Sequence, residues 1–131
     1  QLSSIYMFTS PMLIFAADVD EMLPARTLVY RKCTGDLDET VVLPESEIGS
    51  WLFGTQKGDV WYLTVLNGED ARTFDAKLDF LPKGKYQMEI ATDAPGNRKQ
   101  LVVKKSKVRS GQRLKEELMS GGGFVARISR Y

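Results

Sequence analysis

Residues 72–90 of the chain read RTFDAKLDFLPKGKYQMEI. Apolar and polar residues alternate over residues 73–80, which is the pattern of a strand with one buried face. The alternation returns over residues 85–90, so both segments offer an apolar face to a common layer. Pro82 and Gly84, which lie between them, favour a type I turn. The stretch therefore predicts a β-hairpin with a bulged turn.

Further strands are predicted on both sides of this stretch. Turn-forming glycine, proline and asparagine residues recur between short alternating or apolar runs. The predicted strands are residues 39–43, 48–55, 60–66, 72–80, 85–92, 100–107, 112–119 and 124–129, with residues 27–32 as a further extended segment. Strands at a spacing of about 8–12 residues are typical of an antiparallel sandwich or barrel. We expect a mainly β fold, an antiparallel β-sandwich of about eight strands over residues 24–131.

The N-terminal residues follow a different pattern. Residues 2–17 carry no charge, yet they are too short and too polar for a membrane span and lack the basic start of a signal peptide. Apolar residues recur at helical spacing, and four of them are Ile5, Phe8, Met12 and Phe15. We expect residues 1–23 to be a helical segment with a linker. Because one β-layer covers only one side of a helix, these four residues are predicted to contact a further partner.

Composition limits the possible functions. The 131 residues are 43% hydrophobic, which suffices for one domain with one core. Basic and acidic residues number 18 and 17, so no strong charge indicates a nucleic acid or an anionic membrane as partner. Histidine is absent, which removes the usual general base and the commonest metal ligand. Cys33 is the single cysteine, so the chain has no internal disulfide and Cys33 is interpreted as a small buried apolar residue.

Several short runs suggest chemistry but have simpler interpretations. The carboxylates of residues 18–21 and 36–39 lack the spacing of a calcium loop, and we interpret them as solvated turn residues. A stand-alone enzyme using Asp36, Asp38 or Glu39 is the least favoured hypothesis. Residues 121–123, GGG, precede a strand and predict a tight turn. The basic run at residues 104–113 is typical of an edge strand that resists pairing.

Aromatic residues offer an alternative function. Trp51, Trp61 and Tyr62 are candidates for stacking against sugar rings, and Tyr30 is a further aromatic residue of this kind. Over residues 60–66, however, both alternating faces are apolar, which predicts a central strand covered on both sides and places tryptophan in the core. A carbohydrate-binding module therefore stays as the alternative hypothesis.

Several motifs resemble a known family when they are taken together. Residues 38–43 read DETVVL, residues 57–62 KGDVWY, residues 79–86 DFLPKGKY and residues 121–128 GGGFVARI. In this order and spacing they resemble the C-terminal region of glycoside hydrolase family 97, which comprises α-glucosidases and retaining α-galactosidases. The resemblance implies a C-terminal β-sandwich, described as an oligomerisation region, after a catalytic (β/α)8 barrel. Residues 1–18 would then correspond to the last barrel helix.

The resemblance also implies what this chain lacks. The catalytic carboxylates and calcium ligands of the family lie in the parts that precede this region, so none is carried over to a position here. We therefore expect no catalytic residue, metal site or cofactor in this chain, and no glycosidase activity from it alone. The expected role is that of a non-catalytic C-terminal domain that packs on the catalytic barrel and supports a homo-oligomer. The resemblance further implies a periplasmic or secreted location.

Overall fold

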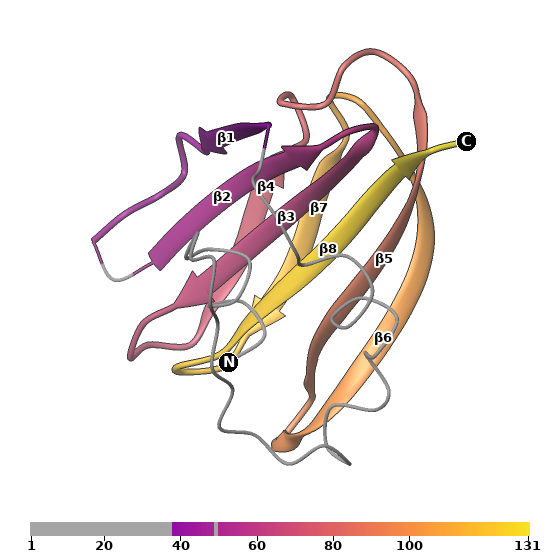
Figure 1. Cartoon of the computed structure of the whole chain (residues 1–131). Coiled ribbons are helices and arrows are strands. Elements are labelled where there is room, and N and C mark those ends of the chain that lie inside the picture. The colour runs from indigo at the N-terminus through magenta and orange to yellow at the C-terminus, as the bar shows by residue number, and fades with distance from the viewer. Residues whose placement is uncertain (1–37, 49) are drawn as a thin grey trace.

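The computed structural model describes residues 38–48 and 50–131 (Figure 1). These residues form eight strands, and every pairing is antiparallel. The strands are β1 (Glu39–Val42), β2 (Ser50–Lys57), β3 (Val60–Asn67), β4 (Arg72–Lys77), β5 (Lys85–Ala94), β6 (Asn97–Arg109), β7 (Arg113–Leu118) and β8 (Gly123–Arg130). The prediction of about eight antiparallel strands is thus confirmed. The predicted helical segment of residues 1–23 and the extended segment of residues 27–32 lie outside the described residues.

The strands form two facing sheets of unequal width. The larger sheet has the order β1-β2-β3-β8-β5-β6, and the smaller sheet consists of β4 and β7. In Figure 1 the smaller sheet lies behind the larger one. The core between them is apolar and includes Leu63, Val65, Phe74, Leu78, Ile90, Leu114, Leu118, Phe124 and Ile128. Phe74 of β4 and Phe124 of β8 meet edge to face with ring centroids 5.1 Å apart, so aromatic packing joins the two sheets.

β3 is the central strand that its sequence predicts. It lies between β2 and β8, and Trp61, Leu63 and Val65 point into the core. On the opposite face Tyr62 and Thr64 are also buried, with exposed fractions of 2% and 0%. Two buried faces explain why this strand lacks the alternation of polar and apolar residues that a half-exposed strand shows.

The predicted hairpin of residues 72–90 is wrong in its pairing. β4 pairs with β7, whereas β5 pairs with β6 and β8, so the connection between β4 and β5 crosses from one sheet to the other. Both strands do turn their apolar faces to the common core, but from opposite sides of it. Leu78 and Leu81 of the connection are buried, and the Tyr86 hydroxyl donates a hydrogen bond to the Pro82 carbonyl at 2.7 Å. Because these two leucines are buried, the connection crosses the end of the core. A hairpin turn would instead project into water.

The hairpin in this part of the chain is the one formed by β5 and β6. Their turn places Gly96 at a φ of 74°, in the left-handed region that favours glycine. β6 lies at the edge of the larger sheet, which confirms the interpretation of its lysines as edge residues. Within the part of the chain described here, no helix is long and apolar enough to cross a membrane.

Candidate functional site

A groove lies beside β7, where the smaller sheet leaves part of the larger sheet uncovered. Its volume is about 690 Å³. One wall is formed by the continuous run of residues 115–119. The rest of the lining comes from the β5–β6 hairpin and from residues close to the sheet ends, namely Ala71, Thr73, Thr92, Asp93, Pro95, Gly96, Val102, Lys104 and Gly123. A two-stranded sheet cannot cover a six-stranded one, and the groove is the consequence.

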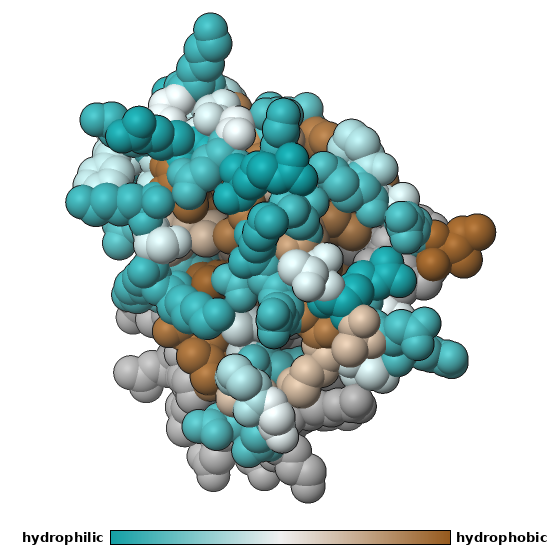
Figure 2. Space-filling model, turned by 180° about the vertical axis from the view of Figure 1, so that it is seen from behind, coloured by the Kyte–Doolittle hydropathy of each residue, from teal (hydrophilic) through white to brown (hydrophobic). Residues whose placement is uncertain are grey.

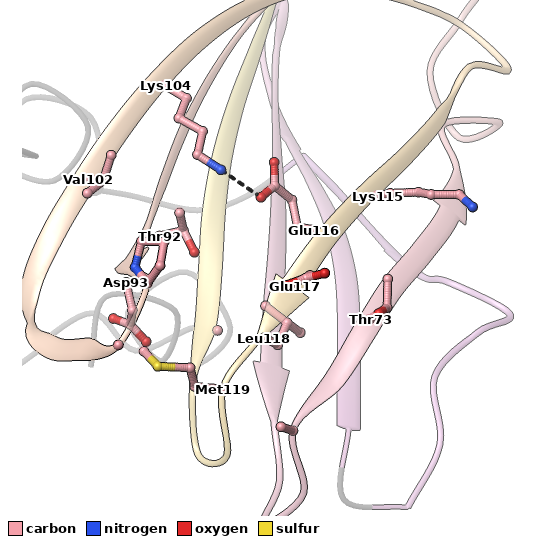
Figure 3. A pocket seen from close by; sticks show the side chains of 14 residues that line it. Thr73, Thr92, Asp93, Val102, Lys104, Lys115, Glu116, Glu117, Leu118 and Met119 are labelled. Carbon is pink, nitrogen blue, oxygen red and sulfur yellow. Dashed lines mark hydrogen bonds and ion pairs between the residues drawn. The ribbon is translucent and has the colours of Figure 1, made fainter.

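An ion pair joins the two sheets across this groove. The Lys104 ammonium donates to the Glu116 carboxylate with an Nζ to Oε2 distance of 3.0 Å, and Figure 3 shows the two groups pointing toward each other. Glu116 lies opposite Phe74 in the register of β4 and β7, in the row that faces the core. Its side chain is only 15% exposed, so the carboxylate needs the charge partner that β6 supplies.

At one end of the groove, two lining residues, Met119 and Asp93, lie close to Gly122. The Gly122 N–H donates to the Met119 carbonyl at 2.9 Å. A Cβ at Gly122 would lie 2.9 Å from this oxygen and 3.1 Å from the Asp93 carboxylate, which is too close for any other residue. The tight turn predicted for residues 121–123 is confirmed. Because Gly122 has no Cβ, the turn between β7 and β8 can pack closely against Asp93 of β5.

The outer face of the smaller sheet carries a compact charge cluster. Arg113 donates to Asp75 with an Nε to Oδ1 distance of 2.8 Å, and the Lys115 ammonium lies 3.1 Å from the other carboxylate oxygen. The hydrogen bond from Arg113, with a further one from Lys115, lowers the pKa of Asp75, and the same carboxylate raises the pKa of Arg113. Figure 2 shows the molecule from behind, with hydrophilic side chains over most of the visible face.

The groove and the charge cluster present a strand edge, an ion pair and exposed charges. The chain has no histidine. Among residues 38–48 and 50–131, no group of three His, Cys, Asp or Glu residues could hold a metal ion. Strand edges, an ion pair and exposed charges recognise a polypeptide better than they activate a nucleophile. The geometry therefore favours a contact surface.

The predicted site residues have different outcomes. Trp61 and Tyr62 are 5% and 2% exposed, so neither ring is open to solvent for stacking, and Trp61 is in the core as predicted. Trp51 pairs with Leu66 in the register of β2 and β3, and its side chain is not among those that the structure describes. Tyr30 and the predicted contact residues Ile5, Phe8, Met12 and Phe15 lie outside the described residues. Their predicted roles stay predictions.

Sequence reasoning did not find the groove. One signal was present, because Glu116 interrupts the apolar row of Leu114 and Leu118 in an otherwise alternating strand. A carboxylate on a core-facing row needs a partner. The partner, Lys104, is on a strand of the other sheet, and only the pairing of sheets brings the two together.

Solved structures share this fold over most of the chain. A glycoside hydrolase family 97 enzyme from Pseudoalteromonas sp. strain K8, solved with acarbose, is 23% identical with a TM-score of 0.73, and the match covers 82% of this chain and 18% of that one. A structure described as a β-arabinopyranosidase is 18% identical with a TM-score of 0.77, and the match covers 97% of this chain and 20% of that one. This chain thus corresponds to a small part of both proteins.

A sequence comparison identifies the family. No curated protein matches the chain. The model of the family described as "Glycosyl-hydrolase 97 C-terminal, oligomerisation" matches residues 36–129, which include β1 to β7 and all of β8 except its last residue. The family resemblance of the sequence motifs is thereby confirmed, and the chain belongs to this family of non-catalytic C-terminal oligomerisation domains of glycoside hydrolase family 97.

Proposed function

We propose that the chain is the C-terminal domain of a glycoside hydrolase, where it packs on the catalytic barrel and holds copies of the enzyme together. The observation that carries this proposal is the family match over residues 36–129. The share of the structural relatives that the chain covers, 18% and 20%, supports it, because it leaves most of such an enzyme to other domains. An α-glucosidase or α-galactosidase activity belongs, in this proposal, to the rest of the parent protein.

In the proposed arrangement the barrel lies on the side of the outer face of the larger sheet, with one layer between them. This face is opposite to β4 and β7, yet its central residues are buried: Tyr62, Thr64, Ala91 and Val125 are exposed by 2% or less. Such an apolar face is suited to packing against a further layer. We assign that layer to the apolar segment of residues 1–23. Its remaining apolar sides would contact the barrel in the parent protein, and another copy when the chain is isolated.

Charged substitutions in the N-terminal segment test this contact. The double variant Phe8→Glu and Phe15→Glu should weaken self-association of the isolated chain and raise its solubility, because carboxylates resist burial against an apolar surface. Light scattering over a concentration series measures the mass. The control adds the same charge at two exposed positions away from this face, Ser106→Glu and Gln112→Glu, and should leave the mass unchanged. An unchanged oligomer in the phenylalanine variant would contradict the contact.

Activity assays test whether the glycosidase activity resides outside this chain. The isolated chain should not hydrolyse nitrophenyl α-glucosides or α-galactosides, and the parent protein should. Measurable turnover by the isolated chain would contradict the proposal. The family resemblance also supports placing the calcium site in the preceding part of the parent protein and locating that protein in the periplasm or outside the cell.

A further inference from the structure

We propose that the free edge of β7 is a docking site for an extended strand from a second copy of this chain. The inference rests on the oligomerisation role proposed above and assigns a surface to it. β7 pairs only with β4, so among the described strands its other edge has no neighbour. That edge faces the groove, and residues 115–119 form the wall.

The register shows which backbone groups are available on this edge. The Leu78 N–H donates to the Gln112 carbonyl at 2.9 Å, which makes residues 78 and 112 a hydrogen-bonded pair. Such pairs alternate along an antiparallel ladder, so the backbone groups of Glu116 point toward β4. Those of Lys115 and Glu117 point away from β4 and toward the groove. Both residues are exposed, so their N–H and C=O groups are accessible to an added strand.

The groove has a floor on which such a strand can rest. Thr92 and Val102 line it from the β5–β6 hairpin, and Leu118 lines it from β7. An extended segment hydrogen-bonded to β7 would lie about 4.8 Å from it. It would therefore satisfy the free backbone groups of β7 and cover Val102, which is half-buried, whereas Thr92 and Leu118 are already buried. This is the geometry of β-strand addition.

The other strand edges are less suitable for pairing. β1 is only four residues long. β6 carries Lys104, Lys105 and Lys107 close together, and lysines on an edge oppose pairing. The Arg72 side chain at the start of β4 is held by Glu47 at 3.4 Å, which brings the turn after β1 near that edge. Among the eight described strands, β7 alone combines a free edge, an adjoining groove and charges of both signs, at Lys115 and Glu117.

A proline substitution tests the proposed edge without changing the pairing of β4 and β7. Glu117→Pro removes one N–H that points into the groove, and proline is tolerated on an edge strand. The matched control is Glu117→Thr, which removes the same charge but retains the N–H. We expect the proline variant to raise the dissociation constant of the oligomer at least about tenfold, and the threonine variant to change it little. Light scattering over a concentration series measures both, and tryptophan fluorescence, to which the buried Trp61 contributes, checks the fold.

Hydrogen exchange gives a second measurement that needs no variant. In the associated wild-type chain the Lys115 and Glu117 amides should exchange slowly, and dilution to the monomer should accelerate them at least about tenfold. The Glu116 amide, which pairs with β4, should not respond. If the chain associates but these two amides exchange freely and Glu117→Pro leaves the mass unchanged, the β7 proposal is overturned while the oligomerisation role stands. A monomer at every concentration would contradict both.

Discussion

Two valines show how strongly burial decides the importance of a residue in this fold. Val65 of β3 is fully buried between the sheets, whereas Val42 of β1 is 54% exposed. Val65→Ala should lower the free energy of unfolding by about 2–3 kcal/mol, since it removes two methyl groups and leaves a cavity. Val42→Ala should change it by less than about 0.5 kcal/mol. Chemical denaturation measures both, and equal effects would contradict the assigned core.

Asp75 should make the stability of the smaller sheet depend on pH. Arg113 and Lys115 lower its pKa below the ordinary value of 3.8. A lowered folded-state pKa contributes stability above the unfolded-state pKa, and this contribution is lost as the pH falls through the folded-state pKa. Asp75→Asn should therefore lower the melting temperature at pH 7, and the two proteins should converge below pH 3.8. Asp79→Asn, another exposed carboxylate, controls for net charge, and a constant difference at all pH values would contradict the ion-pair assignment.

At the level of elements, the connection between β4 and β5 shows why strand pairing differs from strand formation. The alternation of apolar residues in both strands is correct, and both faces reach the core. Pairing depends on the path of the chain between them. Leu78 and Leu81 in this connection are buried, so the chain crosses the end of the core. Gly84 does not have the positive φ that the predicted bulged hairpin turn would use.

Two glycine substitutions distinguish the crossing connection from a hairpin turn. Gly96→Ala should lower the free energy of unfolding by about 1 kcal/mol, because alanine is strained at a φ of 74°. Gly84→Ala should be tolerated, since a Cβ there would lie 3.5 Å from the nearest atom of the Tyr86 ring, an ordinary contact distance. Thermal unfolding of both variants measures the contrast. A larger loss at Gly84 than at Gly96 would favour the hairpin that the sequence predicts.

At the scale of the whole molecule, the domain has two faces with different roles. The outer face of the larger sheet is apolar and buried at its centre, around Tyr62 and Thr64. The smaller sheet presents charges, and its β7 edge adjoins a groove. In the proposed arrangement the first face serves the catalytic barrel and the second serves another copy. One small sandwich could then support both contacts without overlap.

Titration with sugars tests the alternative function. Maltooligosaccharides and galactosides should cause no saturable change in tryptophan fluorescence, because Trp61 is buried among core residues. Denatured chain provides the control for nonspecific quenching. A saturable change in the native chain would favour the carbohydrate-binding hypothesis and would point to Trp51, the other tryptophan.

The amino-acid sequence by itself determined the elements of this protein. Alternation and turn residues placed the strands, the apolar run of residues 60–66 identified the central strand, and the lysines of β6 indicated an edge. These features are local, because a strand's burial pattern and a turn's backbone requirement are written in adjacent residues. The same holds for the family, whose motifs are contiguous.

Only the tertiary structure decided how the elements are combined. The partners of β4 and β5, the ion pair of Lys104 and Glu116, and the groove beside β7 all depend on residues far apart in the chain. Many pairings bury the same alternating faces equally well, so the local pattern does not choose among them. The choice comes from the width of the two sheets and the packing of their connections. These properties belong to the assembled core rather than to any one segment.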